Sequence, residues 1–213
     1  MTSGTEEETL AQIKEWWQRN GKPLLTGGVL ALVVVFGWQY WQKRDLDQAQ
    51  TASVVYQQLL DVSLDASRTD PAEVVRLGNL LKKEFAGTHY AQYGSLFVAK
   101  VAVEGGRLDE AAAELRTVVD KPADQTLGEL ARQRLARVLA AQDKADEALK
   151  LLDGEADKAF AASREELRGD LLVQLGREDE AHAAYSKAKE ALSEEAAIGG
   201  LQLKLDDLAR GEA

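Results

Sequence analysis

A stretch of twenty residues without a charged side chain, Pro23–Gln42, constrains the fold of this chain more than any other feature. A helix of that length rises about 30 Å, which is the thickness of the hydrocarbon core of a bilayer. Aromatic side chains that suit a membrane–water interface gather at its C-terminal end, namely Trp38, Tyr40 and Trp41. The pattern predicts a single transmembrane helix over 23–42, between a tail (1–22) and a large domain (43–213).

Two other interpretations of this stretch compete with a membrane anchor. A cleaved secretory signal has an apolar region as long as Leu24–Phe36, but here Gly-Trp-Gln-Tyr-Trp follows instead of a cleavage site built from small residues. A buried helix of a soluble protein would need apolar partners on every side, and no other part of the chain is apolar enough to surround it. The membrane anchor is therefore the favoured interpretation.

Basic residues near the stretch indicate its orientation. The N-terminal flank carries three of them and the C-terminal flank carries two: Lys14, Arg19 and Lys22 before it, Lys43 and Arg44 after it. Because the flank richer in Lys and Arg tends to stay in the cytoplasm, the count favours a cytoplasmic tail and an exported C-terminal domain by a small margin.

The composition excludes several classes of function. The formal net charge is −10, and an acidic chain repels phosphate backbones, so we expect no nucleic-acid partner. There is no Cys, and the two histidines, His89 and His182, have no second ligand at metal spacing. No phosphate-binding glycine loop or nucleophile elbow is present. We therefore expect no catalytic residues, no cofactor, no metal and no small-molecule substrate.

Residues 43–213 contain an internal repeat. The tripeptide Asp-Glu-Ala occurs at 109–111, 146–148 and 179–181, with spacings of 37 and 33 residues, and each copy follows a helical pattern and a turn. Spacing near 34 residues with two helices per unit is typical of tetratricopeptide-like arrays. The sequence predicts an all-α protein, in which the transmembrane helix is followed by a tetratricopeptide-like helical-repeat solenoid.

Small residues support this register. The third unit has them where two helices of a repeat cross closely, and the first and second units follow the same pattern, with Glu155 as the exception. We attribute the longer first spacing to extra loop residues around 121–124, where Pro122 ends a helix. A helix over 72–86 and a final helix with Ile198, Leu201, Leu205 and Leu208 on one face are expected to cap the array.

Stacked helix pairs expose an extended groove that binds segments of other proteins. The register of the repeat predicts which residues line it. The candidate groove positions are Tyr93, Leu96, Lys100, Gln133, Arg137, Asp170, Val173 and Gln174. This mixture of polar and apolar side chains suits a protein partner. The alternative is a rigid spacer whose surface residues have no binding role.

Two features of the N-terminal part suggest further contacts. Gly27 and Ala31 have the small-xxx-small spacing that lets a second helix approach closely, so they form a candidate docking face in the membrane. Thr5 and Glu8 have the spacing of a capping box, which predicts a helix beginning at Thr5. Residues 20–23, Asn-Gly-Lys-Pro, are expected to break that helix.

The order of these features resembles the YfgM family of Proteobacteria, the ancillary subunits of the Sec translocon. The resemblance lies in an acid-rich start, Gln-Ile-Lys-Glu-Trp-Trp (12–17), Asn-Gly-Lys (20–22), Gly37-Trp38 and Tyr-Gln-Gln-Leu (56–59). It implies a type II inner-membrane protein with its C-terminal domain in the periplasm. It also implies association with SecYEG and with the periplasmic chaperone PpiD, to which newly translocated client polypeptides pass.

Two hypotheses about function follow. In the first, the chain is a non-enzymatic ancillary subunit of the translocon, and its repeats mediate transfer of proteins from SecYEG to periplasmic chaperones. In the second, which the resemblance also suggests, it is a membrane-bound regulator whose cytoplasmic tail restrains a stress-response regulator. Deleting residues 1–15 discriminates between them, because only the regulator needs the tail.

Overall fold

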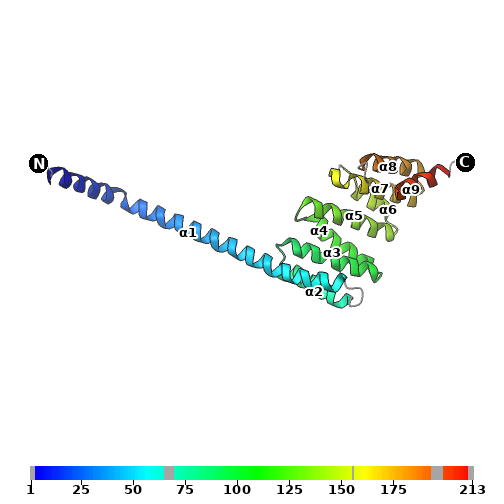
Figure 1. Cartoon of the computed structure of the whole chain (residues 1–213), viewed down its shortest axis with the longest axis horizontal. Coiled ribbons are helices and arrows are strands. Elements are labelled where there is room, and N and C mark those ends of the chain that lie inside the picture. The colour runs from blue at the N-terminus through cyan, green and yellow to red at the C-terminus, as the bar shows by residue number, and fades with distance from the viewer. Residues whose placement is uncertain (1–2, 65–69, 155, 193–198, 211–213) are drawn as a thin grey trace. The chain divides into compact units, whose positions relative to one another are not determined.

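The computed structural model describes residues 3–64, 70–154, 156–192 and 199–210, and all of its regular secondary structure in these ranges is helical (Figure 1). The all-α fold class is confirmed. The chain divides into two compact units, Met1–Gln50 (unit 1) and Thr51–Ala213 (unit 2).

The first helix, α1, spans Ser3–Leu64. One prediction about it is wrong. The helix already includes Ser3, so Thr5 lies inside it and does not start it. The break expected at residues 20–23 occurs as a bend: the helical assignment continues through it, but the axis turns by 50° between Thr9–Lys22 and Leu25–Leu64. Pro23 cannot donate a hydrogen bond to the preceding turn, which explains a bend at this point.

Unit 1 exposes its apolar side chains. Within the predicted anchor the exposed fraction runs from 49% at Val35 to 72% at Tyr40. By length and apolar content, no single described helix qualifies as membrane-spanning, whereas the two arms of α1 do so together. The polar residues Gln39 and Gln42 lower the mean hydropathy at the C-terminal end of residues 23–42.

Unit 2 is a succession of short helices that lie in chain order (Figure 1). Their bounds are α2 Pro71–Glu84, α3 His89–Glu104, α4 Leu108–Asp120, α5 Gln125–Ala141, α6 Ala145–Leu151, α7 Lys158–Gln174, α8 Glu178–Ala191 and α9 Gly199–Arg210. Each helix from α2 to α8 contacts the next one along the chain, α8 contacts α9, and α5 also contacts α7. Three antiparallel pairs result, α3–α4, α5–α6 and α7–α8.

The repeat predicted from Asp-Glu-Ala is confirmed by the second helix of each pair. These helices begin at Leu108, Ala145 and Glu178, one residue before each Asp. The alanine of each tripeptide is 0% exposed, at Ala111, Ala148 and Ala181. Because the same small side chain is buried at the same helix crossing three times, the pairs repeat in packing as well as in sequence.

The turn inside each pair also repeats. Two residues after the end of each first helix lies a residue with positive φ, which is Gly106 (72°), Asp143 (60°) or Gly176 (70°). The next N–H, that of Arg107, Lys144 or Arg177, donates to the carbonyl five residues earlier, at 2.8 to 2.9 Å. This is the Schellman motif, which favours glycine at the left-handed position. Asp143 adopts that conformation without being glycine.

The explanation of the 37-residue spacing is wrong. The connection from α4 to α5 has only four residues, 121–124, and six residues, 152–157, join α6 to α7. The difference lies in the helices, since α4 has 13 residues and α6 has 7. Gly154, with φ of 92°, follows the short helix α6.

Close packing explains the small residues of the third pair. A Cβ at Gly169 on α7 would clash with the ring of Tyr185 on α8, which is 3% exposed. The main core runs from α3 to α9 and includes Leu201 and Leu205 of the terminal helix, as predicted for a cap. Ile198 and Glu155, named in the sequence pattern, lie outside the described residues. At the other end, Ala52 and Leu59 of α1 belong to one buried cluster with Val74, Leu77 and Leu81 of α2.

Candidate functional site

An apolar pocket of about 320 Å³ lies between α3, α4 and α5. Its lining residues are Leu96, Ala99, Lys100, Val103, Glu104, Leu115, Arg134, Arg137 and Val138. The structure thus brings together three of the predicted groove residues, Leu96, Lys100 and Arg137. Leu96 belongs to the buried core, whereas Lys100 and Arg137 are exposed.

The rim of this pocket is basic. Lys100 Nζ donates to Glu104 Oε1 at 2.6 Å, so one pair of charges is compensated. Arg134 and Arg137 have no carboxylate partner among the described residues. Partial desolvation, together with the positive charge of Arg137, holds the pKa of Arg134 below its usual value. The two guanidinium groups therefore repel one another beside the pocket.

Tyr93, the first predicted groove residue, belongs to an aromatic cluster of Tyr56, Tyr90, Tyr93 and Phe97. The ring of Tyr56 lies 5.4 Å from that of Tyr90 and 5.3 Å from that of Tyr93, measured between centroids. All four side chains are partly buried. Such tilted ring pairs stabilise the packing of α3 and still leave aromatic surface exposed.

The other predicted groove residues lie on α5 and α7 and have structural contacts. Gln133 is buried, and its amide donates to Glu129 and to Ser163 Oγ at 3.0 Å. Gln174 donates to the carbonyl of Ala140 at 3.1 Å, which joins α7 to the end of α5. Val173 is 43% exposed.

Asp170 is part of a network that holds the terminal helix. It accepts hydrogen bonds from Tyr185 Oη at 2.9 Å and from Lys204 Nζ at 2.6 Å. Burial and the bond to Asp170 both raise the pKa of Tyr185. Desolvation opposes protonation of Lys204, but its bonds to Asp170 and Glu166 outweigh this and raise its pKa. α9 is therefore fixed to α7 by charged hydrogen bonds.

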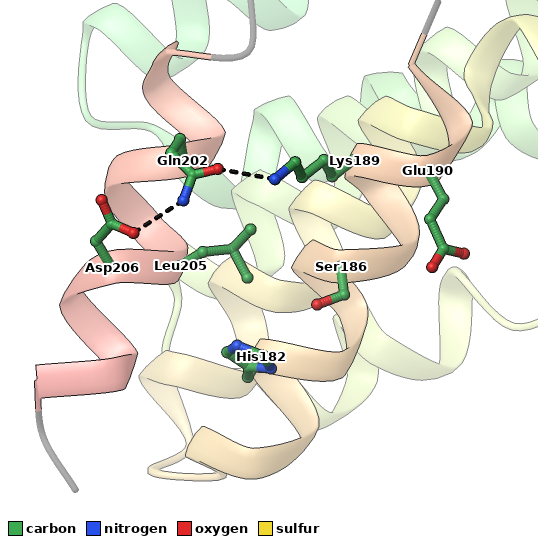
Figure 2. A pocket seen from close by; sticks show the side chains of 7 residues that line it. All are labelled: His182, Ser186, Lys189, Glu190, Gln202, Leu205 and Asp206. Atoms are coloured by element: carbon green, nitrogen blue, oxygen red, sulfur yellow. Dashed lines mark hydrogen bonds between the residues drawn. The ribbon is translucent and has the colours of Figure 1, made fainter.

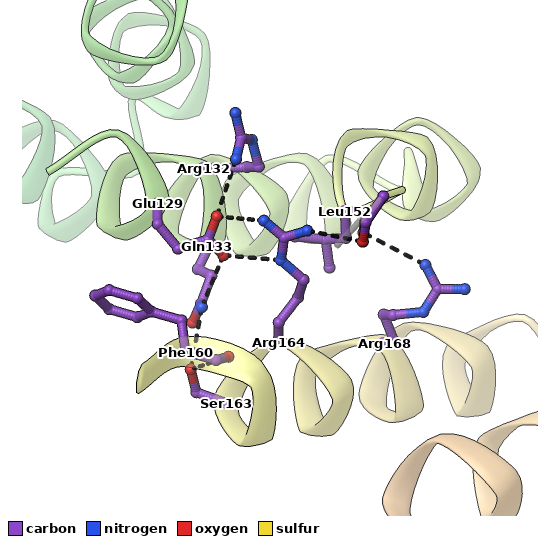
Figure 3. Close-up of polar contacts among 9 residues, drawn as sticks. Glu129, Arg132, Gln133, Leu152, Phe160, Ser163, Arg164 and Arg168 are labelled. Carbon is purple, nitrogen blue, oxygen red and sulfur yellow. Dashed lines mark hydrogen bonds and ion pairs between the residues drawn. The ribbon is translucent and has the colours of Figure 1, made fainter. Parts of the chain in front are cut away.

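A buried ion pair joins α5 to α7 (Figure 3). Arg164 donates to both carboxylate oxygens of Glu129, and the two residues are 3% and 4% exposed. Arg132 donates to the same carboxylate at 2.9 Å. Burial alone would raise the pKa of Glu129, but the hydrogen bonds from Arg164 and Gln133 hold it below the usual glutamate value. Since every oxygen is satisfied, the network fixes the spacing of α5 and α7.

A second pocket, of about 610 Å³, lies between α8 and α9, and most of its lining residues are polar or charged. Figure 2 shows Lys189 donating to Gln202, and Gln202 to Asp206, at 2.9 and 2.8 Å. His182 lies in this pocket, and no cluster of possible metal ligands occurs in the part of the chain that the structure describes. Leu205 is the one aliphatic residue that lines this pocket, whereas five aliphatic residues line the pocket between α3, α4 and α5.

Sequence reasoning missed Arg134 and Val103 as pocket residues. Arg134 precedes Arg137 by three positions, and this helical spacing places both on one face of α5. Val103 follows Leu96 by seven positions on α3, which is also a helical repeat distance. Both spacings were available in the sequence. The buried pairing of Glu129 with Arg164 was not, because its partners are 35 residues apart.

Comparison with known proteins identifies the family to which the chain is related. A family model described as a tetratricopeptide repeat-like domain matches residues 14–210. The chain is 28% identical, over 207 residues, to the ancillary SecYEG translocon subunit of Escherichia coli (strain K12), covering 96% of this chain and 97% of that protein. It is 31% identical to the protein of the same name from Aggregatibacter actinomycetemcomitans, over 87% of this chain and 89% of that one. The Neisseria gonorrhoeae protein of that name is 28% identical over 205 residues.

The family model covers most of the residues in both units, and the relatives match the chain from its N-terminal helix through its repeats. The family suggested by the sequence features is thus confirmed. The chain belongs to the YfgM family of tetratricopeptide repeat-like proteins, whose curated members carry the name ancillary SecYEG translocon subunit.

Proposed function

We propose that this chain is a non-enzymatic, membrane-anchored ancillary subunit of the Sec translocon whose repeat array binds segments of other proteins. The observation that carries the proposal is the match over 96% of the chain to a protein named ancillary SecYEG translocon subunit. Two physical features support it: a helix with exposed apolar side chains in unit 1, and a repeat array with an apolar pocket in unit 2.

The proposal includes a single membrane anchor over residues 23–42. A large apolar surface in contact with water would be costly, and a bilayer covers it at no such cost. Orientation follows from the flanking charges, so the tail 1–22 lies in the cytoplasm and residues 43–213 lie in the periplasm, as in a type II protein. The proposal also includes a helix-docking face at Gly27 and Ala31, whose small-xxx-small spacing would let a second helix approach closely; the space around Gly27 is open.

In unit 2, the proposed protein-binding surface consists of the apolar pocket and the aromatic cluster that Tyr56 of α1 forms with Tyr90, Tyr93 and Phe97 of α3. Tyr93, Leu96, Lys100 and Arg137 contribute to this surface directly. Val173 and Gln174 extend it along α7, while Gln133 and Asp170 hold the helices that carry it. A PpiD-like periplasmic chaperone and translocated client chains are its proposed partners, and transfer between them is the proposed role.

Site-specific photocrosslinking in intact membranes tests this function. A photoreactive side chain at Val33 should crosslink to a SecYEG subunit, and one at Val103 should crosslink to a periplasmic chaperone or a translocating chain. A probe at Arg76, which is exposed on α2 and paired with Glu73, is the matched control outside the pocket. Recovery of neither channel subunits nor chaperones from the first two positions would contradict the proposal.

A further inference from the structure

The pocket between α3 and α5 also indicates what kind of segment it binds. We infer that it takes an acidic–apolar segment of a partner polypeptide, with one or two apolar side chains inside the pocket and a neighbouring carboxylate at Arg134 and Arg137. This inference rests on the proposed function, since it names the ligand chemistry of the same surface.

The apolar part of the argument comes from the floor of the pocket. Ala99, Leu115 and Val138 are 2%, 2% and 6% exposed, and Val103 at the edge is 42% exposed. A volume of about 320 Å³ is at the small end of ligand pockets, which span about 300 to 1,000 Å³. Such a volume suits one or two side chains of a peptide that continues outside the pocket.

The charged part of the argument comes from the rim. Unit 2 belongs to a chain with a net charge of −10, yet two arginines lie together here without a carboxylate partner among the described residues. The acid of the rim, Glu104, is already paired with Lys100. Elsewhere on the array, exposed arginines have such partners: Arg107 pairs with Glu110, Arg116 with Glu147 and Arg177 with Glu180.

A bound carboxylate would remove the repulsion between Arg134 and Arg137 and could form a bidentate pair with either guanidinium. A basic segment would add to that repulsion, and a purely apolar one would leave it in place. The charge at the rim therefore selects acidic neighbours, and the floor selects an apolar side chain between them.

Fluorescence anisotropy with defined peptides tests the inference on the full chain in detergent micelles. The probe is a labelled peptide, Gly-Ser-Asp-Leu-Phe-Glu-Asp-Ser-Gly. One reference peptide replaces its three acids by Lys, and the other replaces Leu-Phe by Ser-Ser. We expect the acidic–apolar probe to bind at least about tenfold more tightly than either reference, and its affinity to fall as salt is raised.

Substitutions test whether the probe peptide binds at the pocket between α3 and α5. The double substitution Arg134→Gln and Arg137→Gln should lower the affinity for the acidic–apolar probe by about tenfold or more. Arg76→Gln combined with Arg116→Gln changes the net charge equally at surface positions away from the pocket and should leave affinity within about twofold. Val103→Asp, at an exposed edge position, should weaken binding independently, and circular dichroism checks that each variant remains folded.

Three results would overturn the inference: no binding of the acidic–apolar probe, equal binding of the Lys reference, or unchanged affinity in the Arg134/Arg137 double variant. The outcome is separable from that of the proposed function. If Val33 crosslinks to the channel while the probe does not bind, the ligand assignment fails and the translocon role stands. If the probe binds the pocket while neither Val33 nor Val103 crosslinks to translocon or chaperone components, the translocon role fails.

Discussion

The two units place the same kinds of side chain in opposite surroundings. In unit 1, Val33 and Phe36 are each 63% exposed, whereas Leu115 and Leu139 of unit 2 are 2% and 1% exposed. Unit 2 alternates apolar and polar faces, so its helices can cover one another. Unit 1 is apolar around the whole helix over 24–36, so no single neighbouring helix could cover it. Unit 2 therefore depends on internal partners, and unit 1 depends on its surroundings.

The largest expected effect tests the internal partners of unit 2. Arg164→Met leaves Glu129 buried without its main partner and should lower the free energy of unfolding by about 3 to 5 kcal/mol, measured by urea denaturation. The control is Arg116→Met, whose partner Glu147 is exposed, with an expected loss of at most about 1 kcal/mol. Equal losses in the two variants would contradict a structural role for the buried pair.

A charge in unit 1 should act differently. Val33→Arg places a cation in the middle of the proposed anchor, where insertion costs about 2.5 to 3.5 kcal/mol. We expect less of the chain in the membrane fraction after carbonate extraction, with the urea midpoint of unit 2 unchanged. Lys22→Arg, which keeps the charge at the flank, is the control. If the Val33→Arg variant stays fully in the membrane fraction and the urea midpoint of unit 2 falls, residues 23–42 are not a membrane anchor.

A smaller effect is expected where α7 and α8 of unit 2 pack closely. Gly169→Ala forces a Cβ against the ring of Tyr185 and should cost about 1 to 3 kcal/mol of stability. The same change at Gly200 on α9 meets no atom within 4 Å and should have almost no effect. Thermal unfolding of the two variants, side by side, measures the difference, and equal melting temperatures would contradict the close packing of α7 on α8.

The smallest expected effect concerns the repeated turn. Asp143 has φ of 60° where the other two turns have glycine, so Asp143→Gly should stabilise unit 2 by a few tenths to about 1 kcal/mol. Gly176→Ala should destabilise it by about 1 kcal/mol or more. If both changes destabilise unit 2 equally in urea, the Asp143 side chain has a role that the turn geometry does not explain.

Much of unit 2 could be predicted because its signals are local. The Asp-Glu-Ala tripeptides marked the second helix of each pair to within one residue, and the glycines at 106 and 176 marked the turns. The 37-residue spacing was misread, because a spacing does not say whether extra residues extend a helix or a loop. The structure shows that the extra residues lengthen a helix, because α4 has 13 residues and α6 has 7.

Predictions about unit 1 were less accurate at its local boundaries. The break expected at residues 20–23 is a 50° bend within a continuous helix, since proline removes a backbone donor and kinks a helix without necessarily ending it. Of the site residues, helical register located Leu96, Lys100 and Arg137 in one pocket. It could not reveal that Gln133 turns toward the Glu129 network, since that contact depends on Ser163 of another helix pair.

The most direct test of the central claim compares the two units in the same cells. The chain has no cysteine, so Val33→Cys, Arg137→Cys and Leu139→Cys each introduce a single thiol for a membrane-impermeant maleimide in spheroplasts. We predict labelling at position 137 in intact spheroplasts, at position 33 after the membrane is dissolved, and at position 139 after unfolding in urea. Labelling of position 33 in intact spheroplasts as fast as position 137, or protection of position 137, would contradict an anchored unit 1 and a periplasmic unit 2.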